Sequence, residues 1–71
     1  MMPEQMVIYK QITFNINGTH TEIRALFFEE PQEARDFVNH IWDLFSNVVD
    51  MQRYDYTGHE YVLLERKHRD L

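Results

Sequence analysis

The stretch that decides the fold is residues 12–23, ITFNINGTHTEI, in which Asn17-Gly18 separates two runs of alternating apolar and polar residues. Asn-Gly is the dipeptide most typical of a two-residue type I′ hairpin turn. A turn at these two residues pairs Ile16 with Thr19 and carries the same register to the far ends of both strands. We therefore expect a hairpin with strands over about residues 6–16 and 19–28.

This register divides the side chains of the hairpin between two faces. One of the two faces is polar near the turn, where Thr13 pairs with Glu22 and Asn15 pairs with His20. The other face is apolar apart from one lysine and two threonines. Its members are Ile8, Lys10, Ile12, Phe14, Ile16, Thr19, Thr21, Ile23, Ala25 and Phe27. Because both strands agree on the same apolar face, we expect that face to pack on the core.

After Phe28 the hydrophobic period changes from two to about 3.6, which indicates a helix. Pro31 suits the first helical turn, and the acids Glu29 and Glu30 complement the helix N-terminus. Apolar residues then recur at helical spacing, at Ala34, Phe37, Val38, Ile41, Leu44, Phe45 and Val48. The pattern predicts one helix over about residues 31–53.

The rest of the chain predicts one more strand. Thr57-Gly58 marks a turn, and residues 60–66 follow as an apolar run. The order ββαβ predicts an α+β fold of two layers, in which one helix packs on one face of an antiparallel sheet. We expect three strands in the order 2-1-3, and a single domain over residues 1–71.

The composition limits the classes of function. The chain has no cysteine, and 7 Lys and Arg residues stand against 12 Asp and Glu residues, which gives a net charge of −5. A general nucleic-acid binder is usually basic, because its affinity comes from neutralising phosphates. A core this small usually needs a metal, a second subunit or very good packing.

The sequence also indicates where the chain acts. Residues 1–5 lack the cationic and apolar regions of a signal peptide, and no apolar stretch is long enough to span a membrane. We therefore expect a cytoplasmic protein with no membrane partner.

Few residues suggest catalysis or a bound cofactor. Asp36, His40 and Asp43 share one helix face with Glu33 nearby, a spacing that could hold a metal. A solvated polar face explains the same residues, so we predict no metal site and no cofactor. Ser46 has no histidine at a suggestive spacing, and we expect no catalytic site and no enzyme.

Three surfaces are candidates for binding a partner. The first is an acidic helix face, on which Asp36, Asp43 and Asp50 recur every seven residues and Glu29 lies one heptad earlier. A charged outer face can serve solubility alone. A line of negative charges can also bind a basic surface of a partner.

The second candidate is an outer sheet patch at the open end of the hairpin, where Val7 lies opposite Phe28 and Tyr9 opposite Leu26. One helix cannot cover both sides of a three-stranded sheet. This patch is then covered by residues 1–5, by the C-terminal tail or by another chain. We favour another chain, and a homodimer first, because two-fold homodimers are the commonest assemblies.

The third candidate is a tyrosine-rich loop, made of Arg53, Tyr54, Tyr56, His59 and Tyr61. Tyrosine and arginine are enriched at binding hot spots. Aromatic rings can also stack on bases, and the basic tail at residues 66–69 could contact phosphates. The alternative is that these tyrosines cap the core.

These features predict a non-enzymatic protein-interaction module, a regulator or inhibitor that covers a surface of a larger partner. Small acidic domains of phages and other mobile elements often act in this way, and the comparison is an analogy only. The alternative is a small nucleic-acid-binding module that uses the tyrosine-rich loop and the basic tail.

Overall fold

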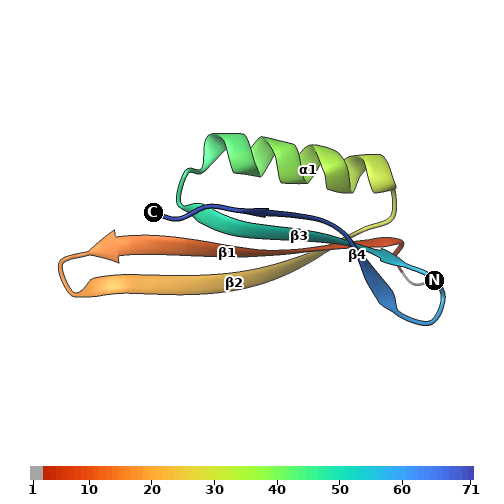
Figure 1. Ribbon diagram of the computed structural model, residues 1–71, viewed down its shortest axis with the longest axis horizontal. Helices are drawn as coiled ribbons and strands as arrows, with labels where there is room; N and C mark the ends of the chain where they lie inside the picture. Colours follow the sequence, from red (N-terminus) through yellow and green to blue (C-terminus); the bar gives the residue numbers. More distant parts are fainter. Residues whose placement is uncertain (1–2) are drawn as a thin grey trace.

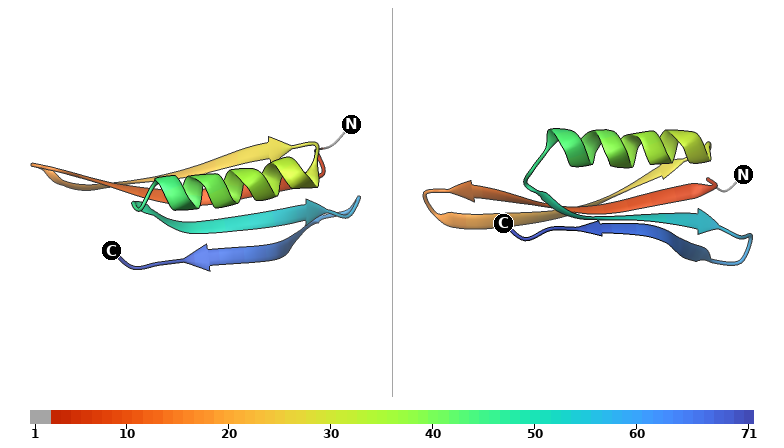
Figure 2. Two further views of the ribbon diagram at one scale, coloured as in Figure 1. Left: turned by 90° about the horizontal axis from the view of Figure 1, so that it is seen from above. Right: turned by 45° about the horizontal axis from the view of Figure 1, so that its top comes forward.

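The computed structural model describes residues 3–71, which form four strands and one helix in the order ββαββ (Figure 1). The elements are β1 (Gln5–Asn15), β2 (Gly18–Phe28), α1 (Pro31–Leu44), β3 (Val48–Tyr56) and β4 (Tyr61–His68). The strands make one antiparallel sheet in the order β2-β1-β3-β4. Helix α1 lies along one face of this sheet (Figure 2). The α+β class is confirmed, whereas the prediction of three strands is wrong. Residues 1 and 2 of the predicted domain lie outside the described range.

The predicted helix is too long, because its second half is strand β3. Helix α1 begins at Pro31 as expected but ends at Leu44, where the N–H of Phe45 donates to the carbonyl oxygen of Ile41 at 3.0 Å. Ser46 and Asn47 form the turn that follows, and both residue types favour turns over helix interiors. Val48 continued the helical spacing only by coincidence, and the segment it begins pairs with β1.

The hairpin turn lies one residue earlier than predicted. Asn15 pairs with Gly18, so that Ile16 and Asn17 occupy the turn, and the side chain of Asn15 accepts a hydrogen bond from the N–H of Asn17 at 2.8 Å. A type I′ turn needs two positive φ angles. Within residues 3–71 no non-glycine residue has one, and Gly18 supplies φ +116° by itself. The register therefore shifts by two residues, which keeps the predicted division into two faces.

The helix covers the face that the sequence assigned to the outside. The buried core consists of Val7, Tyr9, Ala34, Val38, Val48 and Met51, with Leu26, Phe28, Phe37, Ile41 and Trp42 packed against it. The ring of Phe37 contacts both Tyr9 and Phe28, at centroid distances of 5.9 and 5.3 Å. The predicted outer sheet patch of Val7, Tyr9, Leu26 and Phe28 is therefore core, and the prediction that it is free for a partner is wrong.

The length of the helix limits how much of the hairpin it covers. A helix over Pro31–Leu44 extends about 21 Å, whereas an eleven-residue strand such as β1 extends about 36 Å. The helix can cover only the end of the hairpin where Val7, Tyr9, Leu26 and Phe28 lie. On the other face, Ile12, Phe14 and Ile23 lie beyond the reach of the helix.

One part of the hairpin projects beyond the rest of the molecule. Pairing between β1 and β3 ends at Gln11 and Val48. Within residues 3–71 no third strand therefore lies beside residues 13–20, which we call the arm (Figure 1). The molecule measures 44 × 20 × 17 Å, and its radius of gyration is 13.3 Å. A compact chain of this length would have a radius of gyration of about 11 Å. The arm makes the molecule elongated.

Candidate protein-interaction surface

The face of the sheet opposite α1, which we call the open face, has no element of residues 3–71 packed on it (Figure 1). The strand registers place alternate residues of each strand on it. Its apolar members are Met6, Ile8, Ile12, Phe14, Ile23, Ala25, Phe27, Tyr54, Tyr61 and Leu63. Phe14 is 62% exposed and Ile23 is 67% exposed. Side chains of this kind are normally buried, so the open face is the strongest candidate for a binding surface.

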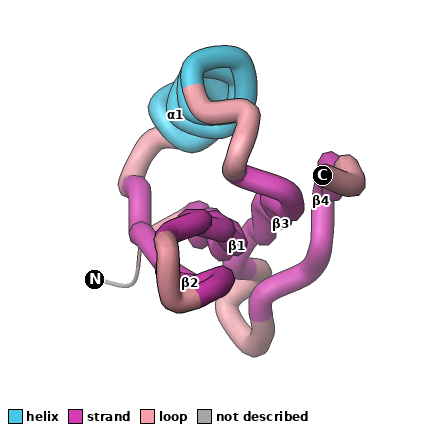
Figure 3. Tube along the Cα trace, turned by 90° about the vertical axis from the view of Figure 1, so that its left-hand side faces the viewer, coloured by secondary structure: helices cyan, strands magenta, loops and turns pink. Residues whose placement is uncertain are grey.

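At the end of the sheet near residue 6, the aromatic side chains cover one another. Phe27 and Tyr61 belong to the two edge strands, yet their ring centroids are 6.3 Å apart, and Tyr61 contacts Tyr56 at 4.9 Å. The sheet must curl toward its open face to bring its two edge strands together. Figure 3, which views the sheet end-on, shows that it is not flat. Tyr54, Tyr56 and Tyr61 are accordingly half-buried.

The predicted tyrosine-rich loop does not exist as one loop. Tyr54 and Tyr56 lie on β3 and Tyr61 on β4, and only His59 lies in the turn between these strands, where it is exposed. Arg53 points to the helix side of the sheet and is 8% exposed. The sequence pattern missed this because it did not predict β3, in which neighbouring residues face opposite ways.

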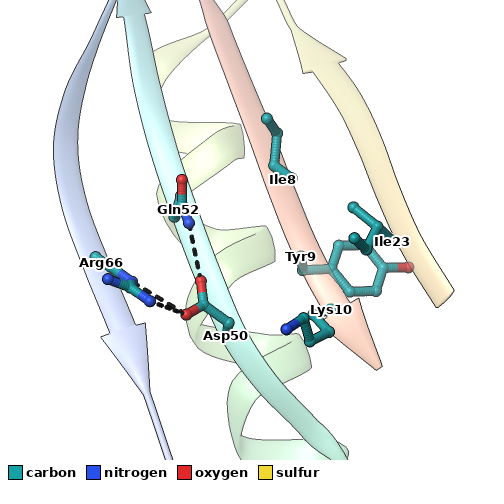
Figure 4. A pocket seen from close by; sticks show the side chains of 7 residues that line it. All are labelled: Ile8, Tyr9, Lys10, Ile23, Asp50, Gln52 and Arg66. Atoms are coloured by element: carbon teal, nitrogen blue, oxygen red, sulfur yellow. Dashed lines mark hydrogen bonds and ion pairs between the residues drawn. The ribbon is translucent and has the colours of Figure 1, made fainter. Parts of the chain in front are cut away.

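A polar cluster lies in the middle of the open face, next to the apolar residues. The carboxylate of Asp50 accepts hydrogen bonds from Arg66 at 2.6 and 3.0 Å and from Gln52 at 3.1 Å, and it lies 3.1 Å from the Nδ1 atom of His68. Lys10 is the cross-strand partner of Asp50. A hollow of about 160 Å³ lies beside this cluster (Figure 4). It is lined by Ile8, Tyr9, Lys10, Ile23, Asp50, Gln52 and Arg66.

The environment of Asp50 favours its ionised form. Burial opposes ionisation, since the residue is only 8% exposed, but the hydrogen bonds from Arg66, Gln52 and His68 outweigh burial and hold the pKa of this carboxyl below its ordinary value. The same hydrogen bond raises the pKa of Arg66, so this pair stays charged. Asp50 therefore belongs to the sheet, and its predicted place on the acidic helix face is wrong.

We expect Asp50→Lys to lower the free energy of unfolding by about 2–3 kcal/mol, because it leaves Arg66 without its partner and adds a third cation next to Lys10. Arg66 is half exposed, so solvent limits the cost. Urea unfolding of the wild type, Asp50→Lys and the exposed control Asp36→Lys measures the difference. For Asp36→Lys we expect a change of less than about 0.5 kcal/mol. An equally small loss of stability for Asp50→Lys would contradict the pairing of Asp50 with Arg66.

The same carboxylate predicts a pH dependence. Because its pKa is lower in the folded than in the unfolded state, its stabilisation is complete above the unfolded pKa of about 4 and is lost as the pH falls through the folded pKa. We expect Asp50→Asn to lose less stability than the wild type when the pH is lowered from neutral to below about 4. Equal acid sensitivity of the two chains would exclude this carboxylate as the cause.

The remaining acids of the predicted helix face are exposed. Glu29, Asp36 and Asp43 are all at the surface, and Asp36 accepts a hydrogen bond from Gln32 at 2.8 Å. His40 is exposed as well, and within residues 3–71 no group of histidine and carboxylate side chains has a geometry suited to a metal ion. Whether Glu29, Asp36 and Asp43 dock a partner stays a prediction.

The basic tail is held against the body of the protein. The guanidinium of Arg69 lies 3.5 Å from the ring centroid of Trp42, and it donates to the carbonyl oxygens of Trp42 at 2.7 Å and Val48 at 3.0 Å. Lys67 donates to Asn39 at 3.0 Å. These contacts tie the end of the chain to α1. With Arg66 bonded to Asp50, all three Lys and Arg side chains of the predicted phosphate-binding tail have partners within the fold.

No helix within residues 3–71 has the length and hydrophobicity that crossing a membrane requires. Comparison with protein-family models, with curated proteins and with solved structures finds no match to this chain. The open face therefore stands as a candidate binding surface on its own geometry and chemistry.

Proposed function

We propose that this chain is a small, non-enzymatic protein-interaction module that acts in the cytoplasm, and that the open face is its binding surface. By covering a surface of a larger protein it would regulate or inhibit that protein. The observation that carries the proposal is the row of apolar side chains Ile8, Ile12, Phe14 and Ile23, which lies on a sheet face that no helix of residues 3–71 covers.

The shape of this row supports a macromolecular partner. Between Met6 and Phe14 the row extends about 27 Å at the rise of an antiparallel strand. Ile16 continues it at the tip of the arm, where its side chain is fully exposed at 101%. Lys10 interrupts the row, and apolar patches on a protein surface usually mark interaction sites.

The charges next to the row support a protein rather than a nucleic acid. The cationic groups Lys10 and Arg66 surround a buried carboxylate, Asp50, and Arg66 is already paired with it. The exposed acids of α1 lie on the other side of the molecule and would repel phosphates. The nucleic-acid alternative has no comparable support, because the tyrosines and Arg69 that it requires contact one another or the core.

The proposal is tested by comparing three immobilised forms of the chain as bait in a lysate of the organism that encodes it. These are the wild type, Ile23→Asp on the open face and Thr13→Asp on the opposite side of the hairpin. We expect a protein that is retained by the wild type and by Thr13→Asp but lost from Ile23→Asp. Retention of the same proteins by all three baits would contradict the proposed surface.

A further inference from the structure

We propose that, while no larger partner is bound, the open face pairs with a second copy of this chain, an inference that rests on the proposed function of that face. In this dimer the arm of each copy lies across the sheet of the other copy, and Phe14 of each copy enters the hollow of the other. Each copy would then contribute both an arm and a hollow to the interface.

The ring of Phe14 and the hollow match in size and in chemistry. The hollow of about 160 Å³ has about the volume of an apolar protein cavity that binds one benzene molecule, about 150 Å³. Ile8 and Ile23 give it apolar walls, and Arg66 lies at its border with its guanidinium hydrogen-bonded to Asp50 (Figure 4). Phe14, 62% exposed on the arm, is an aromatic ring on the same face without cover from its own chain.

The spacing along β1 allows a symmetric arrangement. Phe14 lies two residues from Ile12 toward the tip, and Lys10 at the hollow lies two residues from Ile12 in the other direction. A two-fold axis through the Ile12 positions therefore places each Phe14 over the Lys10 and Ile23 pair of the other copy. A two-fold interface uses the same patch on both subunits, as this one does.

The distribution of charge favours contact through the sheets. The chain carries a net charge of −5, and the exposed acids Glu33, Asp36 and Asp43 lie on α1. On the open face Asp50 lies between Lys10 and Arg66 and compensates most of their charge. Packing the two sheets face to face keeps the acidic helices on the outside of the dimer, where they are far apart and solvated.

The contact area predicts the strength of this dimer. An overlap of residues 8–16 of β1 with the neighbouring strands measures about 27 by 15 Å, so the two copies together bury roughly 800 Å² of surface. This is below the size of a stable specific interface, which indicates a weak dimer that dissociates in the high micromolar range. Dimerisation would stabilise the arm, because an isolated two-stranded ribbon is only marginally stable in water.

Sedimentation equilibrium from about 1 to about 500 µM tests the dimer. We expect the wild type to dimerise within this range and Phe14→Asp to weaken dimerisation by at least about tenfold. Thr13→Asp is the matched control, since this neighbouring residue is exposed on the other side of the arm and should leave dimerisation unchanged. Far-UV circular dichroism confirms that both variants stay folded.

Cross-linking tests the symmetry. The chain has no cysteine, so Ile12→Cys carries a single thiol, which a short bismaleimide should join to the Ile12→Cys of the other copy. Thr13→Cys, on the opposite side, should not cross-link. A wild type that remains monomeric up to about 500 µM, or a dimer that Phe14→Asp does not weaken, would overturn the second copy as the partner. In either case the bait comparison of wild type and Ile23→Asp still decides whether the open face binds another protein.

Discussion

Val7→Asp is expected to unfold the protein, whereas Ile23→Asp is expected to leave it folded. Val7 is fully buried on β1 under the helix, and Ile23 is 67% exposed on the open face. Placing an ionised carboxylate in the core costs several kcal/mol, and a chain of this length has only about 4–10 kcal/mol of stability in total. An exposed substitution usually changes the stability by less than about 0.5 kcal/mol.

Far-UV circular dichroism and urea unfolding of both variants measure this difference. Ile23→Asp should unfold at a urea concentration close to that of the wild type, and Val7→Asp should lack a folded baseline. If the result were reversed, the helix would cover the face of Ile23, as the sequence alone predicted. Equal effects would mean that both faces are buried.

Arg53→Ala is expected to lower the free energy of unfolding by about 3 kcal/mol, because it disrupts a buried polar network. Arg53 donates to the side-chain oxygen of Gln5 at 2.9 Å, Gln5 donates to Asp55 at 2.7 Å, and the guanidinium lies 3.4 Å from Glu65. Removing the guanidinium leaves the oxygen of Gln5 buried without a donor and removes the cation nearest to Glu65. Urea unfolding at neutral pH measures the loss.

Arg53→Met separates packing from charge in the same experiment. Within residues 3–71 the Nε atom of Arg53 has no hydrogen-bond partner, so the arginine already carries part of the cost of burying a polar group. Methionine fills a similar volume without that cost, and we expect it to lose about half as much stability as alanine. A stability of Arg53→Ala equal to that of the wild type would show that the network contributes nothing.

The sequence predicted those features that depend on local chemistry. The hairpin, the division of its side chains into two faces and the start of the helix at Pro31 all follow from turn residues, alternation and helix-terminus preferences. The exact turn was wrong because Asn17 does not adopt the positive φ that its dipeptide favours. A shift by two residues preserved the faces.

The features that the sequence missed depend on competition between elements. Val48 fits both a helical period and a strand, and a short apolar run does not distinguish the two. Once this segment is strand β3, Asp50 moves from a solvated helix to the sheet and pairs with Arg66. The covered face of the hairpin was missed because both faces carry apolar residues at the end under the helix, and no local pattern decides between them.

The rate at which a thiol on the open face reacts tests the central claim most directly. Because the chain lacks cysteine, Ile23→Cys and Val7→Cys each carry a single thiol that a maleimide can label. We expect Ile23→Cys in dilute solution to react as fast as a free thiol and to become protected when excess wild-type chain or a captured partner is added. Val7→Cys should stay protected in the native state throughout. An Ile23→Cys thiol that is protected in dilute solution, or that no bound protein protects, would contradict the open face as the binding surface.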